Sequence, residues 1–295
     1  MSKRLLCCLG LTLAAAGGLH AGAYEEELNA ERAARAQRLT APDGWLSLIG
    51  LHFLATGDNT VGSAPDNQVV LAAGPARLGN VVVDASLRAR LQVSPGVEVR
   101  VNGAPVLSAD LGDGRTGRPV TVTSGTVSAF VIERGGRLAL RVRDTESKRR
   151  REFAGIDYFP TDPAWRIEAT WEPFPRPREV QIKNILGQES KALVLGRAVF
   201  TRDGHTIGLL PLQESPDDPL FFVISDLTSG AETYAAARFL YADPPRDGRV
   251  VLDFNRAINP PCAFTPFATC PLPPKENELP IAVTAGEKDY RGAHD

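Results

Sequence analysis

The sequence predicts a mostly β protein with a short N-terminal helix and two β units packed together. Hairpin-type dipeptides recur along the chain, apolar segments of period two lie between them, and helical periodicity nearly disappears beyond residue 40. The dipeptides are Asn102-Gly103, Gly135-Gly136, Asp203-Gly204 and Asp247-Gly248. Many short strands with close turns are typical of sandwiches and barrels, so the second antiparallel unit is expected to be one of these two.

Residues 1–23 have the layout of a secretory signal peptide. A basic head precedes the apolar run from Leu5 to Ala16, and small residues stand before a cleavage site near Ala23. This run of about a dozen residues is shorter than the roughly 20 that a membrane span needs. We expect an exported protein, periplasmic or secreted, without a transmembrane anchor after cleavage. A buried N-terminal helix and a lipoprotein anchored through Cys8 are the alternatives.

A helical arm is predicted over residues 24–40. Tyr24, Leu28, Arg35 and Leu39 lie roughly one helical turn or a multiple of it apart, which predicts one contact face. The Pro42-Asp43-Gly44 sequence ends the helix.

The remaining chain divides by composition. A β-sandwich is predicted over 41–143, a proline-rich connector over 144–178, and a second β domain with a proline-rich, cysteine-containing loop over 179–295. The expected strands are Val97–Val101, Val120–Thr123, Thr126–Glu133, Leu138–Arg143, Val180–Lys183, Leu193–Phe200, Leu220–Ser225 and Val250–Phe254. In the connector, closely spaced prolines are expected to interrupt regular pairing.

The first β unit resembles a forkhead-associated sandwich. The resemblance rests on the segments 50–54 and 60–71 and on the Asn-Gly turn at 102–103. It implies the fold. That family binds phosphothreonine through an Arg after the first glycine and a Ser-x-x-His loop, whereas Ser63 follows Gly62 here and the loop at 75–79 has neither Ser nor His.

Two further patterns have ordinary interpretations. Residues 112–117 match G-x-G-x-x-G, but the segment that follows is predicted as a strand, so a hairpin loop is favoured over a dinucleotide site. Along 137–143, Arg137, Arg141 and Arg143 alternate with apolar residues. Such a basic face can hold a carboxylate or phosphate, although a solvated or salt-bridged face is the commoner outcome.

Charge and histidine content exclude several function classes. The formal net charge is −2, which provides no global attraction to nucleic acid or to an anionic membrane. The sequence has four histidines and contains no G-x-S-x-G, H-E-x-x-H or C-x-x-C motif. Neither a serine triad, a metal site nor a bound cofactor is predicted.

Most of the chain from about residue 140, together with the preceding sandwich, closely resembles an uncharacterised family, domain of unknown function 1684. The resemblance rests on the run LDFNRAINPPCAFTPFATCPLPPKEN at 252–277, on 158–166 and on 285–288. It implies kinship and no particular chemistry.

Within this run, the two cysteines that remain after export are expected to pair, Cys262 with Cys270, because exported cysteines usually form disulfides. We predict that a functional surface would be organised by the loop 255–277. Its candidate ligand-binding residues are Arg238, Asp253, Asn255, Asn259, Thr265, Asn277 and Glu287. The alternative is a scaffold, in which Arg238 and Asp253 form a salt bridge and the asparagines cap turns.

Three functions remain open. A non-catalytic binding or interaction module would take a small ligand, peptide or glycan in a rigid cleft. A carboxylate-based, hydrolase-type enzyme without cofactor would use Asp253, Glu287 and Asp226 as acid and base, with Arg238 as anion clamp. A structural envelope component would need no ligand.

Overall fold

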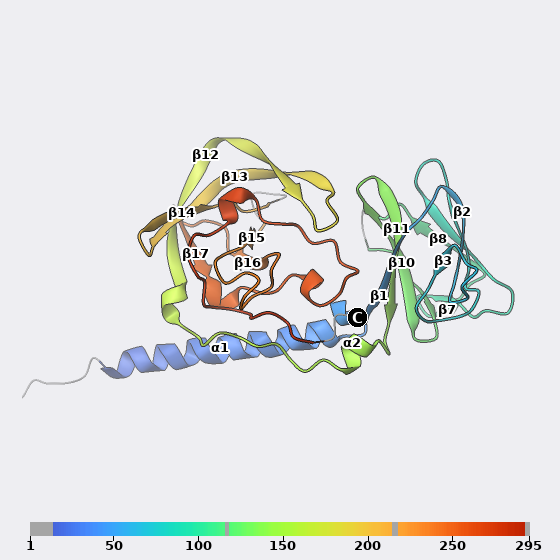
Figure 1. Cartoon of the computed structure of the whole chain (residues 1–295), viewed down its shortest axis with the longest axis horizontal. Coiled ribbons are helices and arrows are strands. Elements are labelled where there is room, and N and C mark those ends of the chain that lie inside the picture. The colour runs from blue at the N-terminus through green and yellow to red at the C-terminus, as the bar shows by residue number, and fades with distance from the viewer. Residues whose placement is uncertain (1–13, 116–117, 214–217, 293–295) are drawn as a thin grey trace, which may run out of the picture.

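A long N-terminal helix, α1 (Ala14–Thr40), lies along the second β unit in the computed structural model (Figure 1). The structure describes residues 14–115, 118–213 and 218–292. The predicted helix over 24–39 is confirmed, and it begins ten residues earlier than residue 24. All four residues of its expected contact face do contact the rest of the chain: Tyr24 and Arg35 form hydrogen bonds to it, and Leu28 and Leu39 are buried.

The end of α1 requires a glycine. A Cβ atom on Gly44 would lie 2.4 Å from the carbonyl oxygens of both Arg38 and Leu39, which is too close for any other residue. The amide of Gly44 donates to the carbonyl of Ala41 at 2.8 Å, which closes the turn. The predicted helix stop over 40–44 is therefore observed.

The first β unit is a sandwich of two sheets. One has the order β1-β11-β10-β9-β6-β7 and the other β3-β2-β4-β5-β8, and all pairs are antiparallel except β2 with β3. The strands are β1 (Leu48–Phe53), β2 (Gly57–Gly62), β3 (Val69–Val70), β4 (Gly79–Val83), β5 (Ala89–Val93), β6 (Arg100–Val101), β7 (Ala104–Pro105), β8 (Ser108–Gly112), β9 (Val122–Ser124), β10 (Val127–Arg134) and β11 (Arg137–Asp144). A short 3-10 helix, η1 (Trp45–Ser47), leads into β1.

The core of this sandwich comes from both sheets. Val61, Val81 and Leu91 of one sheet belong to the same buried cluster as Val131 and Leu140 of the other. The alternation predicted for 137–143 is confirmed, because Leu138, Leu140 and Val142 face this core. The glycine pattern at 112–117 lies between β8 and β9, and the next described element is a strand, which agrees with a loop and not with a dinucleotide fingerprint. The hairpin itself is wrong, because β8 and β9 belong to different sheets and the loop crosses between them.

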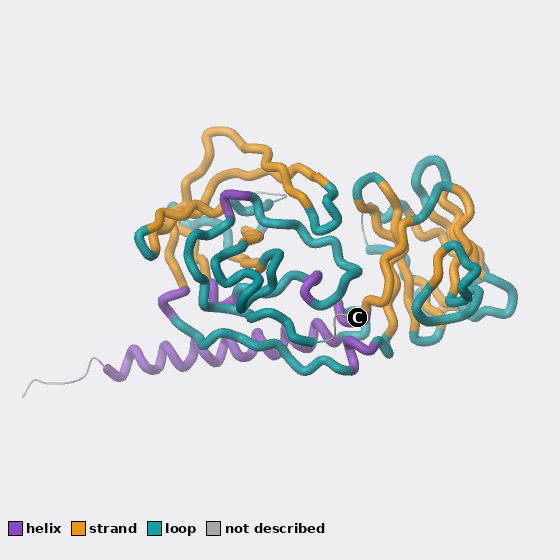
Figure 2. Tube along the Cα trace, viewed as in Figure 1, coloured by secondary structure: helices purple, strands orange, loops and turns teal. Residues whose placement is uncertain are grey.

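The second β unit has a curled sheet of order β14-β13-β12-β17, which forms a half-barrel, and a separate β15-β16 pair. Its strands are β12 (Arg166–Lys183), β13 (Glu189–Arg202), β14 (His205–Leu209), β15 (Leu220–Ile224), β16 (Arg238–Ala242) and β17 (Arg249–Asp253). Residues from both sheets share one core with the chain segment 279–285. Beyond β17 the described chain has only the 3-10 helices η3 (Phe254–Arg256), η4 (Pro261–Ala263) and η5 (Lys275–Asn277), and most of this part is loop (Figure 2).

The predicted connector over 144–178 is only partly a connector. It contains α2 (Lys148–Arg151) and η2 (Pro163–Trp165), but from Arg166 onward the chain already belongs to β12. The prolines do interrupt the pairing of β12 with β13, between Pro173 and Arg178. Because the strand resumes after this irregularity, the prolines bend it without ending it.

The four predicted hairpin dipeptides are confirmed. Both residues of each have a positive φ, from 49° to 81°, as type I′ turns require. Three of them join the pairs β6-β7, β10-β11 and β13-β14, and Asp247-Gly248 lies between Arg246 and Arg249.

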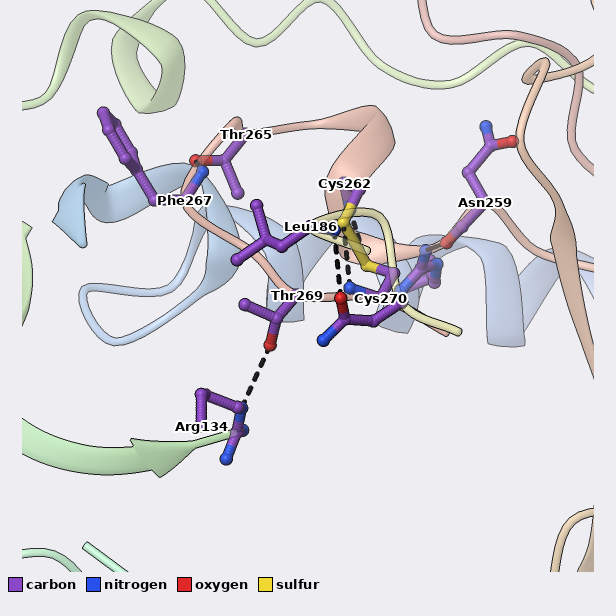
Figure 3. The surroundings of a disulfide bond; sticks show 10 residues. Arg134, Leu186, Asn259, Cys262, Thr265, Phe267, Thr269 and Cys270 are labelled. Carbon is purple, nitrogen blue, oxygen red and sulfur yellow. Dashed lines mark hydrogen bonds between the residues drawn. A yellow bond between two sulfur atoms is a disulfide. The ribbon is translucent and has the colours of Figure 1, made fainter. Parts of the chain in front are cut away.

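The expected disulfide between Cys262 and Cys270 is present, with the Cα atoms 6.1 Å apart (Figure 3). Each cysteine amide donates to the sulfur of the other cysteine, at 3.1 and 3.2 Å. The Cys270 carbonyl also accepts from the amide of Ile185 in the β12-β13 turn, at 3.0 Å. The disulfide therefore closes a loop that rests on this turn.

Candidate functional site

A cleft of about 870 Å³ lies between α1 and the second β unit, and we call it the α1 cleft. Residues of α1 form one wall, and outward-facing residues of β12, β16 and β17 form the other. The charged, polar and aromatic residues that line it, together with Val251, are Glu27, Glu31, Arg32, Arg35, Arg38, Tyr158, Arg166, Glu168, Tyr241, Asp243, Arg246, Arg249, Asp253, Asn255, Arg256 and Glu287.

Three of the seven predicted site residues line this cleft: Asp253, Asn255 and Glu287. The cleft thus brings the end of β17 together with the segment near residue 287. The other four predicted residues lie elsewhere: Arg238, Asn259, Thr265 and Asn277 are all buried outside the cleft lining.

Asp253 anchors α1 through Tyr24. The Tyr24 hydroxyl donates to its two carboxylate oxygens at 2.8 and 2.9 Å, and Arg256 Nε lies 3.0 Å from Asp253 Oδ2. Arg256 also forms ion pairs with Glu27, at 2.8 Å, and with Glu31. Burial and the neighbouring Asp253 carboxylate raise the pKa of Tyr24 above its ordinary value.

Asn255 braces the chain before β12. Its Oδ1 accepts from the amide of Asp162 at 3.0 Å and its Nδ2 donates to the carbonyl of the same residue at 2.8 Å. Nδ2 also lies 3.1 Å from the Tyr24 hydroxyl. Because its amide group is occupied on both sides, Asn255 positions the wall of the cleft.

Glu287 holds the middle of α1. Its side chain is fully buried, and Oε1 accepts from Arg35 Nε at 2.9 Å while Oε2 accepts from the Asn259 amide at 2.7 Å. Arg35 also donates to the Asn259 carbonyl at 2.8 Å. Burial and the Glu287 charge raise the pKa of the adjacent Tyr158. The Asn259 side chain donates to the Lys288 carbonyl at 2.7 Å.

Arg238 has a different partner from the expected one. The predicted Arg238–Asp253 salt bridge is wrong: Arg238 pairs with Asp226 at 2.8 Å, and both side chains are almost completely buried. Arg238 also donates to the carbonyls of Val283, at 2.9 Å, and Ala285. The pair therefore ties β16 to the segment 283–285, away from the cleft.

Asn277 and Thr265 support the backbone. Asn277 is fully buried; its Oδ1 accepts from the Leu210 amide at 2.8 Å, and its Nδ2 donates to the carbonyls of Leu210 and Val223 at 2.9 and 3.0 Å. Thr265 accepts from the amide of Phe267 at 3.3 Å. For these two residues the structure matches the scaffold interpretation.

Sequence reasoning missed the arginines of the cleft. Within the described chain, Arg38, Arg166 and Arg246 form no side-chain hydrogen bond or ion pair, and all three are exposed. The structure shows that Arg166 pairs with Asp253 across β12 and β17 and so faces the same side of the sheet, but the sequence placed Arg166 in the connector and gave no signal for this pairing.

The carboxylates of the cleft are mostly occupied. Arg256 binds Glu27, Glu31 and Asp253, Arg35 binds Glu287, and Glu168 lies 3.7 Å from Arg249. Over the described residues of the cleft wall, Asp243 is the carboxylate without a cation within salt-bridge distance. Arg256 alone serves three of these carboxylates, so the lining as a whole, with seven arginines and six carboxylates, has a formal charge of +1.

The cleft also has an apolar floor. Tyr241 is 51% exposed and Val251 is 38% exposed, and both line the cleft. The ring of Phe221 stacks on that of Tyr241 with centroids 5.0 Å apart, which fixes the tyrosine orientation.

Two further properties of the described residues concern membranes and metal ions. No helix in the described part of the chain is long and apolar enough to cross a membrane. The described residues also contain no group of three or more His, Cys, Asp or Glu side chains placed to hold a metal ion.

The fold and the cleft define a two-unit β protein in which an N-terminal helix closes a cleft on the second unit. Residues 151–288 match the model of DUF1684, a protein family of unknown function. The chain belongs to this family, and the sandwich precedes the matched region.

Among solved structures, the chain is similar to an uncharacterized protein of Haloarcula marismortui determined by solution NMR. The two are 33% identical over 47% of this chain and 78% of that chain, with a TM-score of 0.40. No curated protein matches the chain.

Proposed function

We propose that this protein is a non-catalytic binding module whose α1 cleft takes an anionic small molecule with an apolar part. The observation that carries this proposal is a set of exposed arginines on the cleft wall that have no ion-pair partner in the described chain. Arg38, Arg166 and Arg246 have no counter-charge in the described chain, whereas five of the six wall carboxylates are bound to an arginine.

The size and surface of the cleft fit this ligand class. Its volume of about 870 Å³ lies within the range of small-molecule sites, roughly 300–1,000 Å³. Guanidinium groups bind carboxylate and phosphate through paired hydrogen bonds, while Tyr241 and Val251 offer apolar contact. A ligand with one acidic group and one ring or aliphatic part matches both the arginines and the apolar residues of the cleft.

The enzyme alternative has less support. Acid–base catalysis by paired carboxylates needs at least one carboxyl group that can exchange a proton with a substrate. Asp253 and Glu287 are each engaged by an arginine, and Asp226 is buried against Arg238 outside the cleft. These contacts favour a structural role for all three.

We infer that the first unit is a forkhead-associated-like sandwich without a phosphothreonine site. Its two-sheet arrangement supports the likeness. Ser63, which stands where that family has an arginine, donates through its hydroxyl to the Gly74 carbonyl at 2.9 Å, and Arg77 pairs with Asp66. In this proposal the sandwich is a scaffold beside the family domain.

We also propose export, with cleavage near Ala23. Tyr24 is the first residue of α1 with a recorded side-chain contact to the second unit, in the part whose side chains are described. Cleavage after Ala23 therefore preserves the helix contacts that close the cleft. Mass spectrometry of the exported protein tests the site.

Thermal-shift screening of the purified protein tests the binding proposal. We expect aromatic or aliphatic carboxylates and phosphates to raise Tm at constant ionic strength, while neutral analogues do not. Arg166→Ala and Arg246→Ala should each remove most of this shift. The matched control is Arg90→Ala on β5, an exposed arginine of the sandwich. A shift by neutral analogues alone, or full retention of the shift in both cleft variants, contradicts the proposal.

A further inference from the structure

The outer face of the six-stranded sheet carries arginines that are withdrawn from water. Leu138, Leu140 and Val142 of β11 face the sandwich core, so Arg141 and Arg143 project from the opposite face. Arg141 is only 7% exposed to solvent, although it is a charged residue. The expectation of a solvated basic face is therefore wrong at this position.

Arg141 also lacks a counter-charge. Its side chain forms no hydrogen bond or ion pair with any residue of the described chain, and its Nε is buried without a partner. The nearest recorded contact is the Trp45 ring, whose centroid lies 5.4 Å from the guanidinium carbon. A salt-bridged face, the other common outcome, is thus excluded for Arg141 within the described residues.

Two more arginines accompany it. Arg143 lies 4.8 Å from the Phe130 ring centroid, and its Nε is likewise buried without a partner. Arg134, at the end of β10, donates to Thr269 Oγ1 at 3.0 Å and to the Glu133 carbonyl at 2.6 Å. These donor contacts leave its positive charge unneutralised.

The electrostatics of this cluster are unfavourable without a further group. Burial and the charges of Arg134 and Arg143 lower the pKa of Arg141 to about 10. The carboxylate of Asp43 acts on Arg143, but no ion pair joins them. Burying an unpaired charge is costly, so an anion at this position would stabilise the fold.

The cluster lies at the junction of the two units. The sheet that contains β1, β10 and β11 is the one nearer to the second unit (Figure 1). Arg134 reaches Thr269 beside the disulfide (Figure 3), and Gln188 of the β12-β13 turn donates to the Arg134 carbonyl at 3.3 Å. The Arg149 guanidinium lies 5.3 Å from the Phe267 ring of the same loop.

We propose that Arg141, together with Arg143 and Arg134, binds a compact oxyanion at this junction. The surrounding residues Leu51, Phe53, Phe130 and Ile132 are apolar. Apolar surroundings strengthen a charge-assisted hydrogen bond between a guanidinium group and an anion. This junction site is independent of the α1 cleft.

Inorganic phosphate is the first probe, with sulfate and acetate as comparisons. Titration calorimetry and thermal shift are measured on the whole protein in chloride buffer of constant ionic strength. We expect phosphate to raise Tm in a saturable manner. Arg141→Met, which keeps an apolar stem of similar length, should weaken phosphate binding about tenfold or more. Without phosphate it should melt at least as high as the wild type, because a buried charge is removed.

Matched variants separate this site from others. Arg90→Met on the exposed side of β5 should keep the wild-type phosphate affinity. Arg166→Met examines the α1 cleft as a second phosphate site, and the binding that depends on Arg141 should persist in it. If Arg141→Met fails to fold, Arg141→Lys keeps the charge but loses the planar fork, and it must bind phosphate more weakly.

Three outcomes overturn the proposal. The first is a phosphate affinity equal to that of the wild type in both Arg141 variants. The second is a Tm rise that chloride reproduces at the same ionic strength. The third is loss of phosphate binding in Arg166→Met and not in Arg141→Met. The last result would move phosphate binding to the α1 cleft. Failure of the cleft ligand screen leaves the junction site unaffected.

Discussion

The Tyr24 hydroxyl donates to both carboxylate oxygens of Asp253, a residue 229 positions later in the chain. This contact fixes the first turn after the expected cleavage site to the end of β17. Together with Arg35–Glu287, it holds α1 over the cleft at two points. The helix is therefore part of the cleft wall.

Removing the Tyr24 hydroxyl should loosen the start of α1. Tyr24→Phe loses a hydrogen bond to a charged acceptor at a half-exposed position, so we expect a loss of about 1 kcal/mol in the free energy of unfolding. Urea denaturation measures it. Tyr241→Phe is the control, since the Tyr241 hydroxyl has no recorded hydrogen bond in the described chain. Equal losses in both variants would contradict the anchoring role.

The buried Arg238–Asp226 pair should dominate the stability of the second unit. Arg238→Ala leaves a buried carboxylate without its cation and should cost about 3–5 kcal/mol. A double-mutant cycle with Asp226→Ala should show coupling of at least about 1 kcal/mol, whereas a cycle with Asp253→Ala should be additive within about 0.5 kcal/mol. Coupling of Arg238 to Asp253 instead would support the Arg238–Asp253 salt bridge that the sequence suggested.

Asn277 should behave as a scaffold residue. Asn277→Ala leaves the Leu210 amide and two carbonyls without partners in the interior, so we expect a loss of about 2–3 kcal/mol. Any ligand response of the folded protein should persist. Asn29→Ala, an exposed asparagine on α1, is the control and should change stability by less than about 0.5 kcal/mol. A stable Asn277→Ala protein would contradict the hydrogen-bond account.

Stability should fall at alkaline pH. Burial raises the pKa of all five tyrosines, Tyr24, Tyr158, Tyr234, Tyr241 and Tyr290. Unfolded tyrosines ionise near pH 10, so above about pH 10 the unfolded state binds fewer protons than the native state, and the free energy of unfolding decreases as pH rises.

The phenolate absorbance at 295 nm checks this expectation. The native protein should titrate above pH 10, and its absorbance should rise together with loss of the near-ultraviolet circular dichroism signal. Titration of all five phenols near pH 10 with the fold intact would contradict it.

Opening the disulfide should destabilise the loop 262–270. The entropy of closing so short a loop corresponds to about 2.5 kcal/mol, and this is the expected loss for the Cys262→Ser/Cys270→Ser variant. Denaturation with and without reductant measures it. Reductant should lower the wild-type midpoint and leave that of the variant unchanged; a wild-type midpoint insensitive to full reduction would contradict the prediction.

Local rules predicted local structure. The Asn-Gly, Gly-Gly and Asp-Gly turns depend on positive φ angles at adjacent residues, and those are properties of the dipeptides themselves. The helix face of α1 and the alternation on β11 depend only on short periods, so both could be identified from the sequence. The disulfide was predictable because just two cysteines lie outside residues 1–23.

The site was harder because its contacts are long-range. Asp226 is the partner of Arg238 because β15 and β16 pair with Ile224 opposite Arg238, and β16 was not among the predicted strands. The cleft depends on the docking of α1 onto β17, which no local pattern encodes. The candidate list therefore contained both cleft residues and residues that support the backbone.

The C-terminal end of α1 meets the last residues of the described chain. Leu39 of α1 packs in one small core with Leu46, Phe264 and Tyr290. A ribosome adds about 5–20 residues per second, so the α1 face waits roughly 10–50 seconds for Phe264 and Tyr290 to be synthesised. During that interval the native burial sites of Leu28 and Leu39 are incomplete. The nascent chain therefore carries an early helix rich in charged residues whose leucines lack most of their native partners, and α1 docks only after the last β strand has been made.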